Sequence, residues 1–211
     1  MKRVYFVRHG ETASNVNRSW QDPGEPLNEN GQEQVTVVAK RIKELKFDKM
    51  IVSTIPRAIQ TAEAIVSENK MPYELSDLFR EIKPPTSLIG AIHSSDTESV
   101  MSKFKVARVE FAHDEAWHYE DEENATDFLL RIKKSLDYLS KLPEVNILVV
   151  THGGYLRCCL GWVITGGECT ARDMYKFTTT AKMTNTGITV LEYNNSNWVL
   201  NTWNDQAHFA E

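Results

Sequence analysis

The chain has 211 residues, of which 41% are hydrophobic and 25% charged, a composition typical of a globular protein and unlike a disordered or fibrous one. The net charge of -5 argues against a nucleic-acid or anionic-membrane surface, so an anionic ligand would need a local cluster of cations. The three cysteines give no disulfide framework and no metal-ligand spacing, and no apolar stretch is long enough to cross a bilayer. We therefore expect one domain over residues 1–211, in the cytoplasm, with neither nucleic-acid nor membrane partners.

The first element is an apolar run that ends abruptly in polar residues. Val4–Val7 is β-branched and aromatic, which predicts a strand buried on both faces, and Arg8 and His9 follow at its carboxyl end. Ligands of open α/β sheets bind outside the carboxyl ends of the strands. A guanidinium beside an imidazole at this place predicts an anion site, and Gly10 allows a close approach of backbone or ligand.

The next two segments repeat the order of strand, polar turn and helix. A polar loop over Glu11–Pro26 leads to a helix capped by Asn28, and a strand over Lys49–Ser53 leads to a helix from Arg57 to about Glu68. Apolar residues at helical spacing should face the core at Val35, Val38, Ile42 and Leu45 in the first helix and at Ile59, Ala62 and Val66 in the second. Arg57 follows the end of the second strand, so we expect it at the same edge of the sheet as Arg8.

The middle of the chain has a different character. A brief strand over Tyr73–Leu75 precedes Glu81, and a Pro-Pro pair then opens a segment over residues 83–123 without a clear strand. We interpret residues 83–123 as a mainly helical lid over the sheet that shapes substrate choice. A long helix follows over Asn124–Lys141, with inward-facing side chains at Leu129, Ile132, Leu136 and Leu139.

The last third of the chain completes the sheet. Val145–Thr151 is the strongest strand prediction, and it stops at His152 before an apolar helix from Tyr155 to about Ile164. Two alternating runs, Gly187–Tyr193 and Trp198–Trp203, predict a hairpin at the sheet's edge. These elements predict an α/β fold: a three-layer α/β/α sandwich with a mostly parallel central sheet, an antiparallel edge strand and the lid insertion.

Three strands thus bring two arginines and two histidines to one edge. Arg8 and Arg57 match phosphate oxygens bidentately and stay charged at physiological pH. A histidine with one ring nitrogen held by a backbone carbonyl presents the other as a nucleophile, and nearby cations lower its pKa. His9 is the better nucleophile because it follows its strand directly, and His152 would donate a hydrogen bond to the phosphoryl group. Glu81 is the candidate acid for the leaving alkoxide.

These residues lie in blocks that resemble the histidine phosphatase superfamily, the phosphoglycerate mutase-like proteins, over nearly the whole chain. The blocks are, in order, RHGETASN, PLNENGQEQ, STIPRAIQTAEAI, LFREI and VTHGGYLR. The resemblance implies a phosphohistidine on His9, a phosphate pocket of Arg8, Arg57 and His152, and Glu81 as proton donor and later as base for water. It also implies catalysis without a metal, and we expect no other cofactor.

Further phosphate contacts are expected around this pocket. The resemblance adds the side chains of Thr12 and Asn15. The backbone amides of Gly10 and of the helix after His152 are candidate donors, because a helix N-terminus favours anions. Gly153, which follows His152, is included among the candidate phosphate-binding residues.

Two departures from the cofactor-dependent mutases of this family bear on the reaction. Trp20-Gln21-Asp22-Pro23 replaces their Gly-Trp-x-Asp element, and Ile82-Lys83-Pro84-Pro85 replaces the arginine-rich stretch after the acid. The arginines that would grip a substrate carboxylate are therefore missing there. This favours a phosphomonoesterase acting on a small phosphorylated metabolite, or on a phosphoprotein, over a mutase-like isomerase. A catalytically idle phospho-ligand-binding module is the alternative from another class.

Three other groups have structural interpretations. The acidic run Glu120–Glu123, with His113 and His118, has no helical metal-ligand spacing, so a solvated face is favoured over a metal site. Cys158 and Cys159 are expected to pack in the core, because Leu156, Leu160 and Val163 share their helix. Trp117, His118 and Tyr119 belong either to the core of the lid or to the substrate contacts.

Overall fold

The computed structural model describes residues 1–91, 100–110, 114 and 116–210. In this part of the chain one sheet contains the strands β1 (Lys2–Arg8), β2 (Lys49–Val52), β3 (Tyr73–Leu75), β4 (Asn146–Thr151), β5 (Ile188–Asn194) and β6 (Asn197–Asp205). The helices are α1 (Ala13–Asn17), α2 (Glu29–Lys43), α3 (Pro56–Asn69), α4 (Val100–Glu110), α5 (Ala125–Lys141), α6 (Gly153–Ile164) and α7 (Ala171–Thr180). Short 3-10 turns are η1 (Asp77–Phe79), η2 (Thr86–Leu88) and η3 (Ala207–Phe209).

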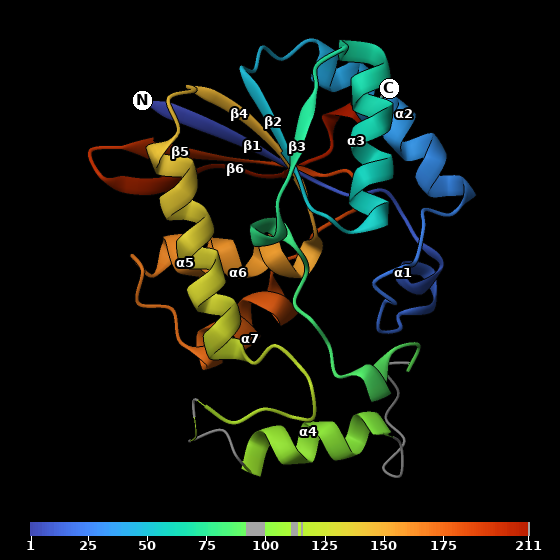
Figure 1. Cartoon of the computed structure of the whole chain (residues 1–211), viewed down its shortest axis with the longest axis vertical. Helices are drawn as coiled ribbons and strands as arrows, with labels where there is room; N and C mark the ends of the chain where they lie inside the picture. The colour runs from blue at the N-terminus through green and yellow to red at the C-terminus, as the bar shows by residue number, and fades with distance from the viewer. Residues whose placement is uncertain (92–99, 111–113, 115, 211) are drawn as a thin grey trace.

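The strand order β3-β2-β4-β1-β5-β6 confirms the predicted mostly parallel sheet (Figure 1). The strands β3, β2, β4 and β1 are parallel, with Arg8 of β1 opposite Thr151 of β4. β5 is antiparallel to β1, and β6 is antiparallel to β5, so the predicted hairpin closes one side of the sheet. β6 is the edge strand on this side. β5, which runs antiparallel to β1, lies between β6 and β1.

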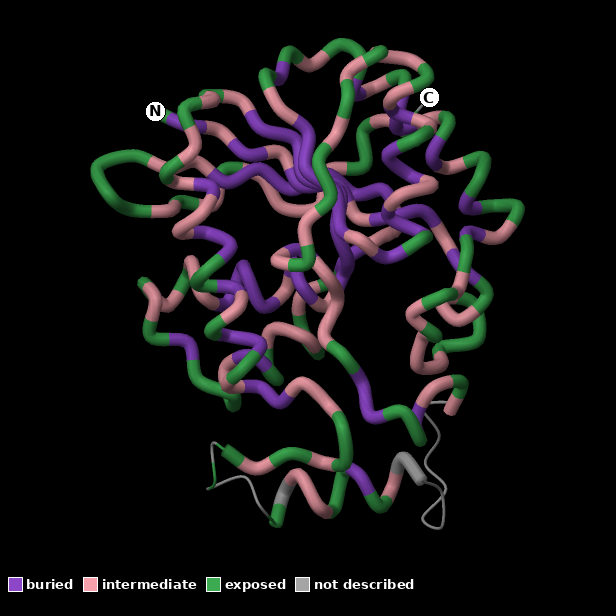
Figure 2. Tube along the Cα trace, viewed as in Figure 1, coloured by how far each residue is buried: buried purple, intermediate pink, exposed green. Residues whose placement is uncertain are grey.

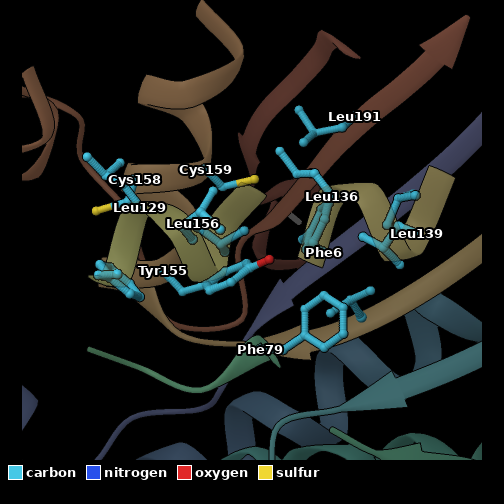
Figure 3. Close-up of a cluster of buried hydrophobic side chains, with 14 of the residues drawn as sticks. Phe6, Phe79, Leu129, Leu136, Leu139, Tyr155, Leu156, Cys158, Cys159 and Leu191 are labelled. Carbon is cyan, nitrogen blue, oxygen red and sulfur yellow. The ribbon is translucent and has the colours of Figure 1, made fainter. Parts of the chain in front are cut away.

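Helices cover both faces of the sheet, which gives the predicted three layers. Figure 1 shows α5, α6 and α7 on one side and α2 and α3 on the other. Between the sheet and α5–α7 lies the larger buried cluster, with Phe6, Phe79 and Tyr155 near its centre (Figure 3). Cys158 and Cys159 are buried in this cluster as free thiols, as predicted. Figure 2 shows long buried stretches in the inner strands, above all β2, β4 and β5.

Several boundaries and faces differ from the predictions. The predicted loop over Glu11–Pro26 contains α1, which begins because Thr12 caps it. The helix predicted from Tyr155 begins at Gly153, with the pair of glycines inside its first turn. Of the residues predicted to face the core from α3, Ala62 is fully buried, while Ile59 and Val66 are only partly buried against the core. The centre of the buried face also includes Arg57 and Thr61, polar residues that an apolar pattern does not detect. Helix α7 had no predicted counterpart.

The described residues of the segment over residues 83–123 lie beyond the carboxyl side of the sheet, where α4 runs across the end of the molecule (Figure 1). Its described residues contain α4 and η2 and no strand. Leu88 and Phe104 form a small buried cluster against Trp20 and Tyr119, and the rings of Phe104 and Tyr119 lie edge to face at 5.1 Å. Tyr119 therefore packs against the small core of this segment, one of the two alternatives left open by the sequence.

Glu120 and Asp121 of the acidic run are exposed, as expected for a solvated face, while Glu122 and Glu123 are partly buried. Asp121 accepts hydrogen bonds from Lys83 Nζ at 2.8 Å and from Thr86 N at 2.9 Å. Glu123 pairs with Arg131 at 2.7 Å, and Glu122 Oε1 accepts from the amide of Tyr119. Asp121 thus joins the two ends of the segment over residues 83–123, a contact between residues far apart in the sequence that the prediction did not include. No helix among the described residues is long and apolar enough to span a membrane.

Candidate active site

The ends of β1, β4 and β2 place three polar residues side by side. The ladder continues one residue beyond the strands, because His9 N donates to Thr151 O at 2.9 Å and Ser53 N donates to Val150 O at 3.0 Å. β4 lies between the other two strands, so His152 stands between His9 and Ser53. The sheet itself thus fixes the backbone from which both imidazoles project.

His9 is held with one ring nitrogen in use and the other turned to a cation. Its Nδ1 lies 2.7 Å from Gly10 O, so Nδ1 carries the proton, and Arg57 Nε donates to its Nε2 at 3.3 Å. The ring is 1% exposed. Burial, followed by the charges of Arg57 and Arg8, holds the pKa of His9 well below its usual value. The Nε2 lone pair is therefore unprotonated at neutral pH and available for attack on phosphorus.

His152 lies next to this nucleophile. The two ring centroids are 5.1 Å apart. Its Nε2 is 2.7 Å from Ser53 Oγ, while its buried Nδ1 has no hydrogen-bond partner among the described residues. Burial and then the charge of Arg57 hold its pKa well below the usual value, so this ring is also neutral.

The two arginines approach the histidines from different elements. Arg57, 2% exposed on the first turn of α3, donates from Nη1 to Asp22 O at 3.2 Å in addition to its bond to His9. Arg8 donates from Nη1 to Met183 O at 2.7 Å, and its buried Nε has no partner in the described part of the chain. Burial lowers the pKa of both groups, that of Arg8 to about 10, with the charge of Arg157 as the next cause there. Both therefore remain charged at neutral pH.

Glu81 lies at the N-terminus of α6. Its Oε2 accepts from Gly154 N at 2.8 Å, and its Oε1 accepts from Tyr155 N at 2.8 Å and from Ile82 N at 3.1 Å. The charge of Glu81 opposes the lowering of the pKa of both Arg8 and Arg57. Glu81 and Arg8 lie against neighbouring glycines of α6, Gly154 and Gly153.

Arg131 of α5 fixes the backbone that carries Glu81. It donates to the carbonyl oxygens of Leu78, Arg80 and Glu81 at 3.1, 2.7 and 3.2 Å, and it grips Glu123 with two bonds of 2.7 Å. One partly buried side chain therefore joins the segment before the lid to the segment after it. No pattern in the sequence indicates this role, because Arg131 looks like an ordinary polar residue of an amphipathic helix.

The two other side chains predicted to contact phosphate, Asn15 and Thr12, both have partners within the protein. Asn15 Oδ1 accepts from Thr12 N at 3.3 Å and from Asn185 Nδ2 at 2.9 Å, which fixes the Asn15 amide beside the strand end. Thr12 is buried, and its hydroxyl caps α1 and accepts from Gln21 at 2.6 Å. Asn185 also donates to His9 O at 3.1 Å, a role that the sequence analysis missed.

The glycines serve close packing more than phosphate binding. Gly10 N donates to Thr61 Oγ1 at 3.1 Å, and a Cβ at Gly10 would lie 2.8 Å from Gly31 O, so the close approach is that of α2. A Cβ at Gly153 would lie 3.1 Å from Arg8 Nε, so this glycine lets Arg8 lie against α6. The amides of Gly154 and Tyr155 bind Glu81, and the expected donor set of Gly10 and the α6 amides is therefore largely used by the protein.

Among the described residues, no group of three or more His, Cys, Asp or Glu side chains could hold a metal ion. His113 of the considered acidic cluster lies outside the described residues, while His118 pairs with Asp127 at 3.6 Å. Catalysis without a metal stays a prediction.

This geometry agrees with what comparison of the chain with known proteins finds. The model of the histidine phosphatase superfamily (branch 1) matches residues 4–206. The chain belongs to this superfamily. This confirms the family that the five sequence blocks predicted.

The relatives of this superfamily member carry different names. The protein named "Probable phosphoglycerate mutase GpmB" from Enterobacter sp. (strain 638) is 27% identical over 206 residues, which cover 96% of this chain and 90% of that protein. Among solved structures, a phosphoserine phosphatase mutant from Entamoeba histolytica has a TM-score of 0.80 at 23% identity over 99% of this chain and 100% of that one. The alpha-ribazole phosphatase from Shigella flexneri has a TM-score of 0.78 at 21% identity, with 96% of each chain covered. These structures share the fold.

Proposed function

We propose that the protein is a phosphomonoesterase that hydrolyses a small phosphorylated metabolite through a phosphohistidine on His9. The observation that carries the proposal is the fixed His9 ring: Nδ1–H is bonded to Gly10 O, and the Nε2 lone pair faces Arg57 in a buried site. An unprotonated imidazole beside two guanidinium groups matches what phosphoryl transfer requires, a nucleophile next to charge that neutralises the phosphate.

In the first step, His9 Nε2 forms a bond to phosphorus as the bond between phosphorus and the substrate oxygen breaks. The leaving oxygen takes the proton of a protonated Glu81 and departs as an alcohol. In the second step, the Glu81 carboxylate takes a proton from water while the water oxygen bonds to phosphorus. The bond between phosphorus and His9 breaks, inorganic phosphate leaves, and His9 and protonated Glu81 are regenerated.

The other residues bind and orient the phosphoryl group. Arg8 and Arg57 carry full charges in a buried site, where charge stabilisation is stronger than in water. His152 supplies a neutral ring beside the nucleophile, and in the proposed reaction its Nδ1–H donates to a phosphoryl oxygen. The pinned amide of Asn15 is a further donor at the same strand end.

A second candidate function is a phosphoglycerate mutase-like isomerase. It is favoured by the name of the Enterobacter relative, since that protein is called a phosphoglycerate mutase. Against it stands the sequence after Glu81, where Ile82-Lys83-Pro84-Pro85 offers no arginine, and where Lys83 pairs with Asp121.

The test combines trapping with a product assay. The protein is incubated with phosphorylated metabolites and quenched in alkali, and we expect an acid-labile phosphate on His9 and steady release of inorganic phosphate. His9→Ala should abolish both. Incubation with 3-phosphoglycerate, with and without the bisphosphate cofactor, separates the alternatives, because isomer formation without phosphate release would favour the mutase. Binding of phosphorylated ligands without any turnover would favour a non-catalytic module.

A further inference from the structure

The first turn of helix α6 packs against two charged side chains of the site. A Cβ at Gly153 would lie 3.1 Å from Arg8 Nε, and a Cβ at Gly154 would lie 2.5 Å from Glu81 Oε1, so Arg8 and Glu81 both rest on the first turn of α6. Arg157 follows Gly153 by four residues on the same helix. Residues four apart share a helix face, so Arg157 is next to Arg8 along that face.

The segment over residues 181–183 holds these two arginines together. Ala181 O accepts from Arg157 Nε at 2.8 Å, and Met183 O accepts from Arg8 Nη1 at 2.7 Å. The carbonyl between them, Lys182 O, accepts from Trp203 Nε1 at 3.0 Å, which ties the segment to β6. Because neutral carbonyls hold both guanidinium groups, the contacts fix their positions without cancelling their charges.

In the described part of the chain, no carboxylate pairs with Arg157. Within the described residues Arg157 makes no ion pair within 4.0 Å, and the hydrogen bond it makes to Ala181 uses Nε. The Arg157 side chain is half-buried. After burial, the charge of Arg157 is the largest cause that lowers the pKa of Arg8. Two like charges are thus kept close in a partly desolvated place, an arrangement that an anion stabilises and that costs stability otherwise.

We propose that Arg157 forms a second anion subsite beside the phosphate pocket, which binds a carboxylate or second phosphate of the substrate. The inference rests on the proposed function, since Arg8 and Arg57 are taken to hold the transferred phosphoryl group. It also supplies from α6 a cation of the kind that the segment after Glu81 lacks. The substrate is then a phosphomonoester with a second negative group a few bonds from the phosphate.

The experiment uses substrate pairs that differ in the second anion. 3-Phosphoglycerate is compared with glycerol 3-phosphate for the carboxylate, and fructose 1,6-bisphosphate with fructose 6-phosphate for the phosphate. In the wild type, kcat/KM should favour the doubly anionic member of at least one pair. Arg157→Gln should lower that preference about 10-fold or more, the effect of losing a charge-assisted bond. Arg172→Gln, which removes an exposed arginine of α7, is the matched control and should keep the wild-type preference.

An equal loss for both members of each pair in Arg157→Gln would overturn the proposal, because Arg157 would then serve only the transferred phosphoryl group. The absence of any preference in the wild type would overturn it as well. Calorimetric binding of the same pairs to His9→Asn, with and without Arg157→Gln, separates this inference from the proposed reaction. If the wild type hydrolyses nothing but the binding preference depends on Arg157, the hydrolase proposal fails and the second subsite stands.

Discussion

Ser53 Oγ lies 2.7 Å from Nε2 of His152 in a place where both side chains are fully buried. Ser53 Oγ also accepts from Ile55 N at 3.3 Å, and we infer that its own proton points to the imidazole. His152 then accepts at Nε2 and carries its own proton on Nδ1, the buried nitrogen without a partner among the described residues. Ser53 thus selects the tautomer in which His152 donates a hydrogen bond to the phosphoryl group.

Replacing this hydroxyl should impair catalysis more than folding. Ser53→Ala leaves the His152 tautomer unfixed, and we expect kcat/KM to fall about 10-fold, while the free energy of unfolding falls by about 1 kcal/mol. Thr54→Ala is the matched control, since the neighbouring hydroxyl bonds to Asp77 and not to an imidazole. Steady-state kinetics over a pH series, together with denaturant unfolding, measures both effects. Equal kinetics for the two variants would show that Ser53 does not act through His152.

The pH dependence of activity should reflect the buried nucleophile. The pKa of His9 is held well below 6.5, so lowering the pH from 7.5 to 6 leaves Nε2 unprotonated. We therefore expect the acid limb of kcat/KM to lie below pH 6, where a solvent-exposed histidine would already be mostly protonated. A pH series on one substrate, combined with NMR titration of the His9 ring, tests this. A limb centred at 6.5 or above that matches the His9 titration would contradict it.

Much of this site was predictable because the residues follow strands. Arg8, His9 and His152 come directly after apolar runs that read as buried strands, and parallel strands place their carboxyl ends together. Arg57 was found in the same way, one short turn after β2. The order of elements therefore determined which side chains meet, even where boundaries moved by two residues, as at the start of α6.

The supporting contacts were not predictable, because they join residues far apart in sequence and use ordinary polar side chains. Asn185 reaches both His9 O and Asn15 Oδ1 from the turn before β5, in a stretch without a periodic pattern. Arg131 lies on the polar side of a helix whose apolar face alone was informative. The contacts of Asp121 were not predictable for the same reason, since its partners Lys83 and Thr86 lie at the other end of the segment over residues 83–123.

Arg131 should matter for both stability and catalysis. Arg131→Gln removes both bonds to Glu123 and weakens the hold on the carbonyls of the Glu81 segment, so we expect a loss of about 2–3 kcal/mol in unfolding free energy and a reduced kcat. Lys133→Gln on the same helix breaks only an exposed pair with Asp137 and should cost about 0.5 kcal/mol or less. Unfolding curves and kcat for both variants make the comparison. If Arg131→Gln loses stability but keeps kcat, Arg131 does not position Glu81.

Gly154 offers a test of Glu81 that separates activity from stability. A Cβ at Gly154 would lie 2.5 Å from Glu81 Oε1, so Gly154→Ala must displace the carboxyl group from the α6 amides. Alanine is otherwise favoured over glycine in a helix by up to about 1 kcal/mol, so the fold has little to lose. We expect kcat to fall about 10-fold or more while the Tm stays within a few degrees of the wild type.

Gly161→Ala on the same helix provides the opposite case. There a Cβ would lie 2.8 Å from the Phe177 ring, between α6 and α7, so we expect a loss of about 1–3 kcal/mol in stability with kcat retained. Thermal unfolding and steady-state kinetics on both variants complete the test. The three atoms nearest a Cβ at Gly154 all belong to the Glu81 carboxyl group. Full activity in Gly154→Ala would therefore mean that proton transfer does not use the position that this carboxyl group has on α6.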